Sequence, residues 1–329
     1  MPLPQPFAFG VCSIQQVLSN CPIEAIPEKV YSKFVMTLLQ QPIHIAPELL
    51  RCLPPQVATS LLKGSQLQLP GPMVWHEWGH ESLDKGASTL VLLHGGSGSW
   101  THWILSVAPL VADGFHVLAV DLPGFGDSAL PENGGDVDAL IEPLHAAWQM
   151  LRASDNVSFI GFSFGGMTAA LWLAAYPQDA KNLILVGSPG LGIKSPHRVP
   201  LKGWRHLPTE DMQTEAHRHN LLGLMLHDES KLDELAMTVH RLNVARDRMP
   251  RRRLSGTPIV ANALPHIVCP VHVIYGEWDA LYKGCMSEVE KIFKKVTPHL
   301  ASWQLVSGSG HWVQFEAPEA FQIALKKTL

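Results

Sequence analysis

Short apolar runs, each followed by a turn and then a helical pattern, limit most strongly the folds that this chain can adopt. The runs are TLVLLHGG, FHVLAVDLPG, NVSFIGFS, KNLILVGSPG, CPVHVIYGEWD and ASWQLVSGSGHW, and MVWHEWG is a candidate for an earlier strand. Each run is rich in Val, Ile and Leu and ends in Gly, Asp or Ser. Nearly continuous apolar strands that alternate with helices predict an α/β fold with a mostly parallel, doubly wound sheet covered on both faces. The chemistry of such sheets gathers at the carboxyl ends of the strands.

Two segments depart from this alternation. Residues 191–264 contain no convincing strand and are richer in Lys and Arg than in Asp and Glu, although the whole chain has a net charge of -4. They follow one strand and precede the next, so we predict a helical insertion that covers the strand ends as a lid. Residues 1–65 read as irregular and then helical, which predicts an N-terminal helical extension. Residues 66–190 and 265–329 then form the two parts of the core.

The stretch NVSFIGFSFGGMTAALWLAAYP, residues 156–177, places Ser163 at a sharp corner between a strand and a helix. Gly161 and Gly165 allow the chain on either side of the serine to approach closely, and Gly166 lets the helix pack against the strand. The amino end of that helix favours developing negative charge. The corner is either a tight structural turn or a nucleophile elbow, and its strand–turn–helix context favours the second interpretation.

A serine hydroxyl needs a general base, and the candidate is His311 in LVSGSGHW. His311 follows the last predicted strand, whereas His94 precedes a glycine loop and is predicted to order that loop. The base in turn needs a carboxylate that fixes its tautomer. YGEWD offers Asp279, with Glu277 as the alternative closer to the strand. The order Ser163, Asp279, His311 is the one expected of this triad on a doubly wound sheet.

The loop LLHGGSGSW is the candidate for half of an oxyanion hole. Its glycines let backbone N–H groups turn inwards, so Gly96, with Ser97 as alternative, is predicted to supply one donor. Phe164, directly after the nucleophile, is predicted to supply the other. The alternative is a phosphate-binding loop, but the sequence lacks the GK[ST] ending and the spaced acidic residue of nucleotide-binding folds.

These motifs resemble the α/β-hydrolase fold superfamily. The matching landmarks are HGGSGSW, DLPGFGDS, GFSFGG, YGEWD and GSGHW, and the resemblance covers roughly residues 66–190 and 265–329. It implies the α/β-hydrolase fold with a helical lid inserted between strands 6 and 7. It also implies a serine hydrolase that needs no cofactor, with Ser163, Asp279 and His311 as its catalytic residues. Asp121 in DLPGFGDS is interpreted as structural.

GHWVQFEAPEAF and the HGG loop are most similar to the branch that contains meta-cleavage-product hydrolases and small carboxylesterases. The meta-cleavage enzymes usually carry Asn or Gly next to the nucleophile, whereas here Phe162 and Phe164 flank Ser163. This departure favours an ester or lactone over the C–C bond of a dienone acid, which the same triad can also hydrolyse. Dehalogenases and epoxide hydrolases of the superfamily use Asp at the elbow, so Ser163 speaks against them. A non-catalytic sensor on this fold is the third alternative.

Aromatic residues adjoin the catalytic positions and predict an apolar pocket for a small apolar or aromatic acyl group. The candidate substrate-binding residues are Ser97, Trp100, Phe162, Trp278 and Trp312. The run RDRMPRRRLS adds five arginines, which form either a solvated face or a group with one member in the cleft. In the second case an arginine such as Arg252 would pair with a substrate carboxylate.

Composition excludes several classes of protein. A pI near 6.5 gives no electrostatic case for nucleic acid. The five cysteines are scattered without a C-x-x-C pair, which argues against both a disulfide framework and a zinc site. No apolar run reaches the length of a membrane span, and the N-terminus lacks the basic region of a signal peptide. We therefore expect a cytoplasmic protein that binds a small-molecule substrate without metal or cofactor, as a monomer or a homodimer.

Overall fold

The computed structural model describes residues 40–69, 73–131, 135–151, 154–195, 197, 200–249 and 251–329. The part of the predicted N-terminal extension before residue 40 lies outside the described residues. The described chain is built around one nine-stranded sheet. Its strands are β1 (Gln40–Pro42), β2 (Ser65–Leu69), β3 (Met73–Trp78), β4 (Thr89–Leu93), β5 (His116–Val120), β6 (Val157–Phe162), β7 (Asn182–Val186), β8 (Val271–Gly276) and β9 (Leu300–Val306).

The order of strands across the sheet is β1-β2-β3-β5-β4-β6-β7-β8-β9. The six strands from β5 to β9 are parallel, and β1, β2 and β3 extend the sheet as antiparallel neighbours. The prediction of a mostly parallel α/β sheet is thus confirmed, and every predicted apolar run forms a strand. The two strands at one side of the sheet, QQP and SQLQL, were not predicted, because they are short and mostly polar. With them counted, the inserted segment lies between β7 and β8.

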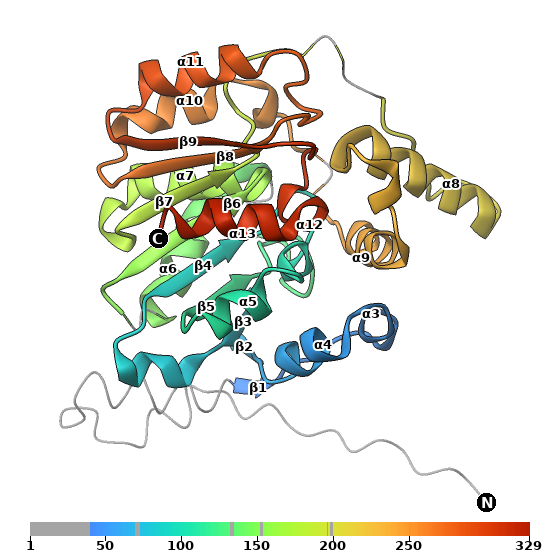
Figure 1. The fold of residues 1–329 in the computed structure, drawn as a ribbon, viewed down its shortest axis with the longest axis horizontal. Helices are drawn as coiled ribbons and strands as arrows, with labels where there is room; N and C mark the ends of the chain where they lie inside the picture. Colours follow the sequence, from blue (N-terminus) through green and yellow to red (C-terminus); the bar gives the residue numbers. More distant parts are fainter. Residues whose placement is uncertain are drawn as a thin grey trace, which may run out of the picture. The chain divides into compact units, whose positions relative to one another are not determined.

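Helices cover both faces of this sheet (Figure 1). The α-helices are α3 (Pro47–Cys52), α4 (Pro55–Leu61), α5 (Val107–Ala112), α6 (Ile141–Leu151), α7 (Phe164–Ala175), α8 (Glu210–Asn220), α9 (Glu234–Ala245), α10 (Ile259–Ala263), α11 (Met286–Val296), α12 (Val313–Glu316) and α13 (Pro318–Lys326).

Strand β6 illustrates how the sheet buries both faces. Successive side chains of a strand point to opposite faces. The Phe159 ring contacts Trp148 of α6 and Trp172 of α7. Its neighbour Ile160 belongs to the core on the other face, which includes Phe321 of α13 and residues of α5. Every residue of β6 is buried, so the strand that leads into Ser163 is held rigidly from two sides.

The segment between β7 and β8 contains α8, α9 and α10, and no strand among its described residues. In Figure 1, α8 and α9 stand together at the right of the sheet. Side-chain oxygens of Thr209 and Asp233 cap the amino ends of these two helices by accepting N–H bonds from Met212 and Ala236. Action of this segment as a lid stays a prediction. Among the described helices, none is long and apolar enough to cross a membrane.

Candidate active site

Ser163 occupies a strained turn between β6 and α7. Its backbone has φ 51° and ψ -117°, outside the regions that a serine normally adopts. The turn requires glycine at two positions. A Cβ on Gly161 would lie 2.4 Å from the Gly165 carbonyl oxygen, and a Cβ on Gly165 would lie 2.2 Å from the Leu93 carbonyl oxygen. The predicted close approach of Gly161 and Gly165 is therefore confirmed.

Three side chains from different strand ends form a hydrogen-bonded chain. His311 follows β9, and its Nε2 lies 2.9 Å from the Oγ of Ser163. Its Nδ1 lies 2.8 Å from Oδ2 of Asp279, which follows β8. Because an ionised carboxylate only accepts, Nδ1 carries the proton and Nε2 is left to accept the Ser163 hydroxyl proton. This arrangement is able to activate a serine hydroxyl as a nucleophile.

Asp279 is held in place from the other side as well. It is fully buried, and its second oxygen, Oδ1, accepts the backbone N–H of Leu281 at 2.9 Å. Glu277, the alternative carboxylate, is exposed, and its Oε2 accepts the N–H of Gly308. The structure thus brings Asp279, and not Glu277, into contact with His311.

The glycine loop after β4 faces the amino end of α7. A Cβ on Gly96 would lie 3.6 Å from Cβ of Phe164. Hydrogen bonds between described residues do not engage the N–H of Gly96, and the N–H of Phe164 is the first of α7, which has no intrahelical acceptor. Both predicted donors therefore adjoin Ser163. Ser97 has φ 53°, so the loop turns sharply directly after Gly96.

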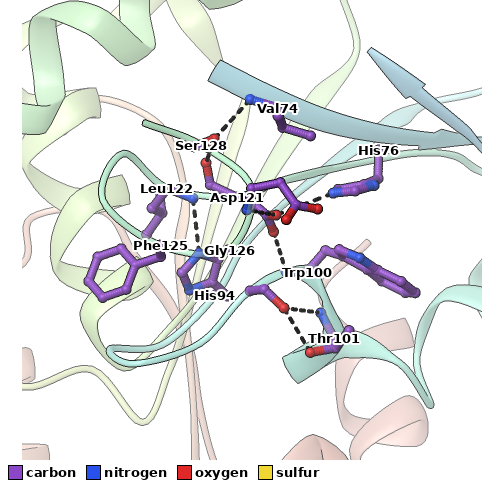
Figure 2. Close-up of polar contacts among 12 residues, drawn as sticks. Val74, His76, His94, Trp100, Thr101, Asp121, Leu122, Phe125, Gly126 and Ser128 are labelled. Carbon is purple, nitrogen blue, oxygen red and sulfur yellow. Dashed lines mark hydrogen bonds and ion pairs between the residues drawn. The ribbon is translucent and has the colours of Figure 1, made fainter. Parts of the chain in front are cut away.

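A buried polar network joins this loop to the turn that follows β5 (Figure 2). His94 lies 2.7 Å from the Gly95 carbonyl oxygen through Nδ1, and its Nε2 accepts the N–H of Leu122 at 2.9 Å. The two oxygens of Asp121 accept the N–H groups of Trp100 and of Asp127. His94 and Asp121 therefore fix the glycine loop in relation to the sheet.

The His76 ring also contacts Asp121, with Nε2 and Oδ2 separated by 3.5 Å. Burial alone would raise the pKa of the Asp121 carboxyl. The neighbouring His76 and His94 and the N–H of Asp127 outweigh that effect and lower the pKa to about 2. Asp121 is thus a buried carboxylate below the glycine loop, in agreement with the structural role predicted for it.

Because His94 is buried, we expect the free energy of unfolding to decrease in mild acid. Burial lowers the pKa of His94 from 6.5 to about 4, so the unfolded chain binds a proton at a higher pH than the folded chain does. The stability that this group contributes is complete above pH 6.5 and is lost as the pH falls towards 4. For this residue alone we expect the free energy of unfolding to be about 2 kcal/mol lower at about pH 5 than at neutral pH.

Urea unfolding followed by tryptophan fluorescence at both pH values measures this difference. His94→Gln cannot take up a proton, so its pH dependence is expected to be smaller. His299→Gln, at an exposed position, is expected to behave like the wild type. An equal decrease in all three proteins would contradict the assignment to His94.

A cavity of about 210 Å³ opens beside Ser163. Its residues come from the strand ends and from the segment between β7 and β8, which places both parts of the chain around one site. The lining residues are Gly95, Gly96, Ser97, Phe162, Ser163, Phe164, Pro189, Leu201, Leu224, Met225, Arg252, Ser255, Leu281 and His311. Most of this wall is apolar, so the cavity suits an apolar group next to a carbonyl.

Arg252 is the cation in this wall. Its Nη2 donates to Ser97 Oγ at 2.8 Å, and its Nη1 pairs with Asp247 Oδ2 at 2.8 Å. The guanidinium also lies over the rings of Phe125 and Phe164, with its central carbon 5.2 and 6.0 Å from the ring centroids. These contacts hold the charge beside the glycine loop and Ser163.

The other arginines of the run have different surroundings. Arg246 pairs with Asp127 at 2.9 Å, and Arg248 donates to the carbonyl oxygen of Gly126 at 3.1 Å. Both arginines therefore tie the inserted segment to the turn after β5. Arg251 and Arg253 are exposed.

The structure places three predicted substrate-binding residues away from the cavity. Trp100 is buried against Trp78, with ring centroids 5.2 Å apart. Trp312 is buried and donates its indole N–H to the His102 carbonyl oxygen. Trp278 is 42% exposed and stacks on His227. The side chains next to His311 and Asp279 in the sequence point away from the site, because the chain turns at these positions.

Half of the residues that line the cavity were not predicted from the sequence. Pro189 lies three residues after the end of β7, and its position near a strand end could have indicated it. Leu201, Leu224 and Met225 lie in the inserted segment and carry no motif. Asp247, the partner of Arg252, is visible in the sequence only as an acidic residue within a basic run.

Comparison with known proteins agrees with this geometry. Residues 90–322 match the model of the alpha/beta hydrolase family. A 2-hydroxy-6-oxononadienedioate/2-hydroxy-6-oxononatrienedioate hydrolase from Cupriavidus pinatubonensis is 29% identical over 72% of this chain and 84% of the relative. A 2-hydroxy-6-oxo-6-(2'-aminophenyl)hexa-2,4-dienoic acid hydrolase from Metapseudomonas resinovorans is 26% identical over 70% and 80% of the two chains.

Solved structures support the same fold. A carboxylesterase from Bacillus subtilis superposes with a TM-score of 0.63 at 20% identity, over 86% of this chain and 98% of the other. A thermophilic esterase from Thermogutta terrifontis gives a TM-score of 0.60 at 19% identity, over 80% and 96% of the two chains.

Proposed function

The chain belongs to the alpha/beta hydrolase family, and from this premise we propose that it is a serine hydrolase of carboxylic esters or lactones of small apolar or aromatic acids. One observation carries the proposal: Ser163, His311 and Asp279 form a continuous hydrogen-bonded chain at the end of the apolar cavity.

In the proposed reaction His311 Nε2 accepts the proton of Ser163 as Oγ attacks the carbonyl carbon. Asp279 keeps the proton on Nδ1 and stabilises the imidazolium that forms. The N–H groups of Gly96 and Phe164 stabilise the oxyanion, and each such donor is worth about 10²–10³ in rate. His311 then protonates the leaving group. Water, activated by the same histidine, releases the acid from Ser163.

Labelling with a fluorophosphonate tests for an activated serine. We expect the intact mass to rise by one adduct, and peptide mapping to place that adduct on Ser163. Ser163→Ala should remain unlabelled, and His311→Ala should react much more slowly because it lacks the base. A folded protein that forms no adduct, or forms it elsewhere, would contradict the proposal and favour a binding or sensor role.

A second candidate function is C–C bond hydrolysis of a dienone acid. The hydrolases from C. pinatubonensis and M. resinovorans are named for such substrates, and Arg252 places a cation in the cavity wall where a substrate carboxylate could bind. Coloured ring-cleavage products test this alternative, because their visible absorbance disappears on hydrolysis. Turnover of these products much faster than of aryl esters would make C–C hydrolysis the main reaction.

Arg252 is expected to set a preference for substrates with a carboxylate. Arg252→Met keeps an apolar stem against Phe125 and Phe164 but removes the charge. We expect kcat/KM to fall about 10–100-fold for monoesters of diacids, since a charged hydrogen bond is worth about 1.5–3 kcal/mol. Neutral esters should change little. Initial rates on matched acidic and neutral esters measure the difference.

Arg251→Ala, at an exposed position in the same run, is the matched control and should leave both rates unchanged. Equal losses on acidic and neutral esters in the Arg252 variant would mean that this arginine only supports the fold of the loop.

A further inference from the structure

A cluster of three potential metal ligands lies at the end of the sheet opposite to Ser163. Glu77 is near the end of β3, and His116 is the first residue of β5. The parallel strands begin at this end, whereas the candidate active site follows their carboxyl ends. Nε2 of His116 and Nδ1 of His80 both approach Oε1 of Glu77, at distances of 2.9 and 2.8 Å. The three ligand atoms all lie within 4.8 Å of one another.

The backbone builds this convergence. Glu77 pairs with Leu118 across the antiparallel β3–β5 ladder, so His116, two residues away, lies on the same face as a diagonal neighbour. Gly79 then turns the chain back with φ 70°, and a Cβ there would lie 2.6 Å from the Phe115 carbonyl oxygen. That close approach brings His80 over the sheet and onto Glu77. Local geometry and strand register thus place the three side chains together.

The donor set fits a divalent transition metal. Two imidazole nitrogens and one carboxylate oxygen are typical ligands of Zn²⁺, which also accepts a water or an external ligand in its coordination shell. Ligands about 2.1 Å from a tetrahedral ion lie about 3.4 Å apart, so each pair to Glu77 needs to open by about half an ångström. Two histidines make Ca²⁺ or Mg²⁺ unsuitable.

Hydrogen bonds with neighbouring groups hold the side chains of Glu77 and His116 in place. Glu77 is buried, and its Oε1 accepts hydrogen bonds from both histidines. The Nδ1 of the buried His116 lies 3.0 Å from the Thr89 hydroxyl. Because an ionised carboxylate only accepts, Nε2 donates to Glu77 in the absence of an ion, and Nδ1 accepts from the Thr89 hydroxyl. When an ion replaces the Nε2 proton, Nδ1 carries the ring proton and donates to the same hydroxyl, as in metal-bound histidines.

We propose that Glu77, His80 and His116 bind a divalent transition-metal ion such as Zn²⁺, which joins β3, β5 and the 3₁₀ helix η2 (His80–Lys85). The cysteine spacing could not indicate this site, because none of its ligands is cysteine. The His80 side chain is 55% exposed, so an ion reaches the site from solvent.

Co²⁺ and Zn²⁺ test the proposal on the full chain after treatment with EDTA and dialysis. Co²⁺ is expected to bind with one-to-one stoichiometry and to give visible bands typical of a nitrogen–oxygen site of low coordination number. Zn²⁺ at about a hundredfold excess over its Kd is expected to raise Tm by about 5 °C. Hydrolysis of an aryl ester should not change, because the ion binds at the other end of the sheet.

His80→Ala and Glu77→Gln should abolish both the Co²⁺ bands and the Zn²⁺-induced shift in Tm. His80→Ala removes a half-exposed ring and should fold normally, which circular dichroism checks. His44→Ala, at an exposed position outside the cluster, is the matched control and should retain both signals. Equal shifts in wild type and in His80→Ala, or the absence of bands and shift in the wild type, would overturn the proposal.

Discussion

Replacement of Ser163 with alanine is expected to lower kcat for ester hydrolysis by about 10⁴–10⁶. The hydroxyl is the group that His311 contacts at 2.9 Å, and alanine offers no atom that forms the acyl-enzyme. A residual rate above that in water is expected, because the cavity and the N–H donors still bind the substrate and stabilise the oxyanion. Initial rates with a chromogenic aryl ester measure this loss.

Ser255→Ala is the matched control for that experiment. Ser255 lines the same cavity as Ser163 but lies outside the hydrogen-bonded chain, so its removal should change kcat by less than about tenfold. A Ser163→Ala protein that retains more than a hundredth of the wild-type rate would show that another group carries the reaction.

The second large effect is expected from Asp279→Asn, which should lower kcat by about 10⁴. The amide keeps the shape of the carboxylate, but its NH₂ group presents a donor to His311 Nδ1. The imidazole then carries its proton on Nε2, where it cannot accept from Ser163. The loss should therefore appear in kcat without a comparable change in KM, as steady-state kinetics on one aryl ester will measure.

Glu277→Gln tests whether Glu277, rather than Asp279, is the functional carboxylate of YGEWD. Glu277 is exposed and accepts the N–H of Gly308, so its amide should retain most of the wild-type rate. If instead Glu277→Gln were as inactive as Asp279→Asn, the hydrogen bond at 2.8 Å between Asp279 and His311 would not be the functional one.

The parts of the fold that were visible in the sequence are those with a strong local pattern. A fully buried strand such as β4 or β6 is apolar along its whole length, and the alternation with helices then dictates a parallel sheet. Strands β1 and β2 have no such pattern. Residues of β2 such as Gln66 and Gln68 pair within the sheet through their backbones, and backbone pairing leaves little trace in the side chains of a short, mostly polar strand.

Some residues of the candidate site could likewise be placed from the sequence, and others could not. Ser163, Asp279 and His311 each follow a strand, and strand ends of a parallel sheet meet at one edge, so their convergence could be inferred without coordinates. Trp312 could not be placed by its adjacency to His311, because neighbouring residues in a turn point in different directions.

The cavity wall could be predicted only in part, and Arg252 was named only as one example among five arginines. Arg252 lies beyond the end of α9, in a stretch without helical period, so no pattern distinguishes it from the other arginines of the run. Its position depends on Asp247 and Ser97, which are 150 residues apart in the sequence.

Ser97 and Ser163 are the two non-glycine residues with positive φ in the described part of the chain, and both line the cavity. Each such conformation costs about 1–3 kcal/mol, and the packing and hydrogen bonds of the surrounding structure must offset this strain. Selection for heat resistance alone is therefore expected to favour glycine at these two positions, and glycine at position 163 would remove the proposed nucleophile. A useful selection scheme for this scaffold therefore scores catalysis in every round.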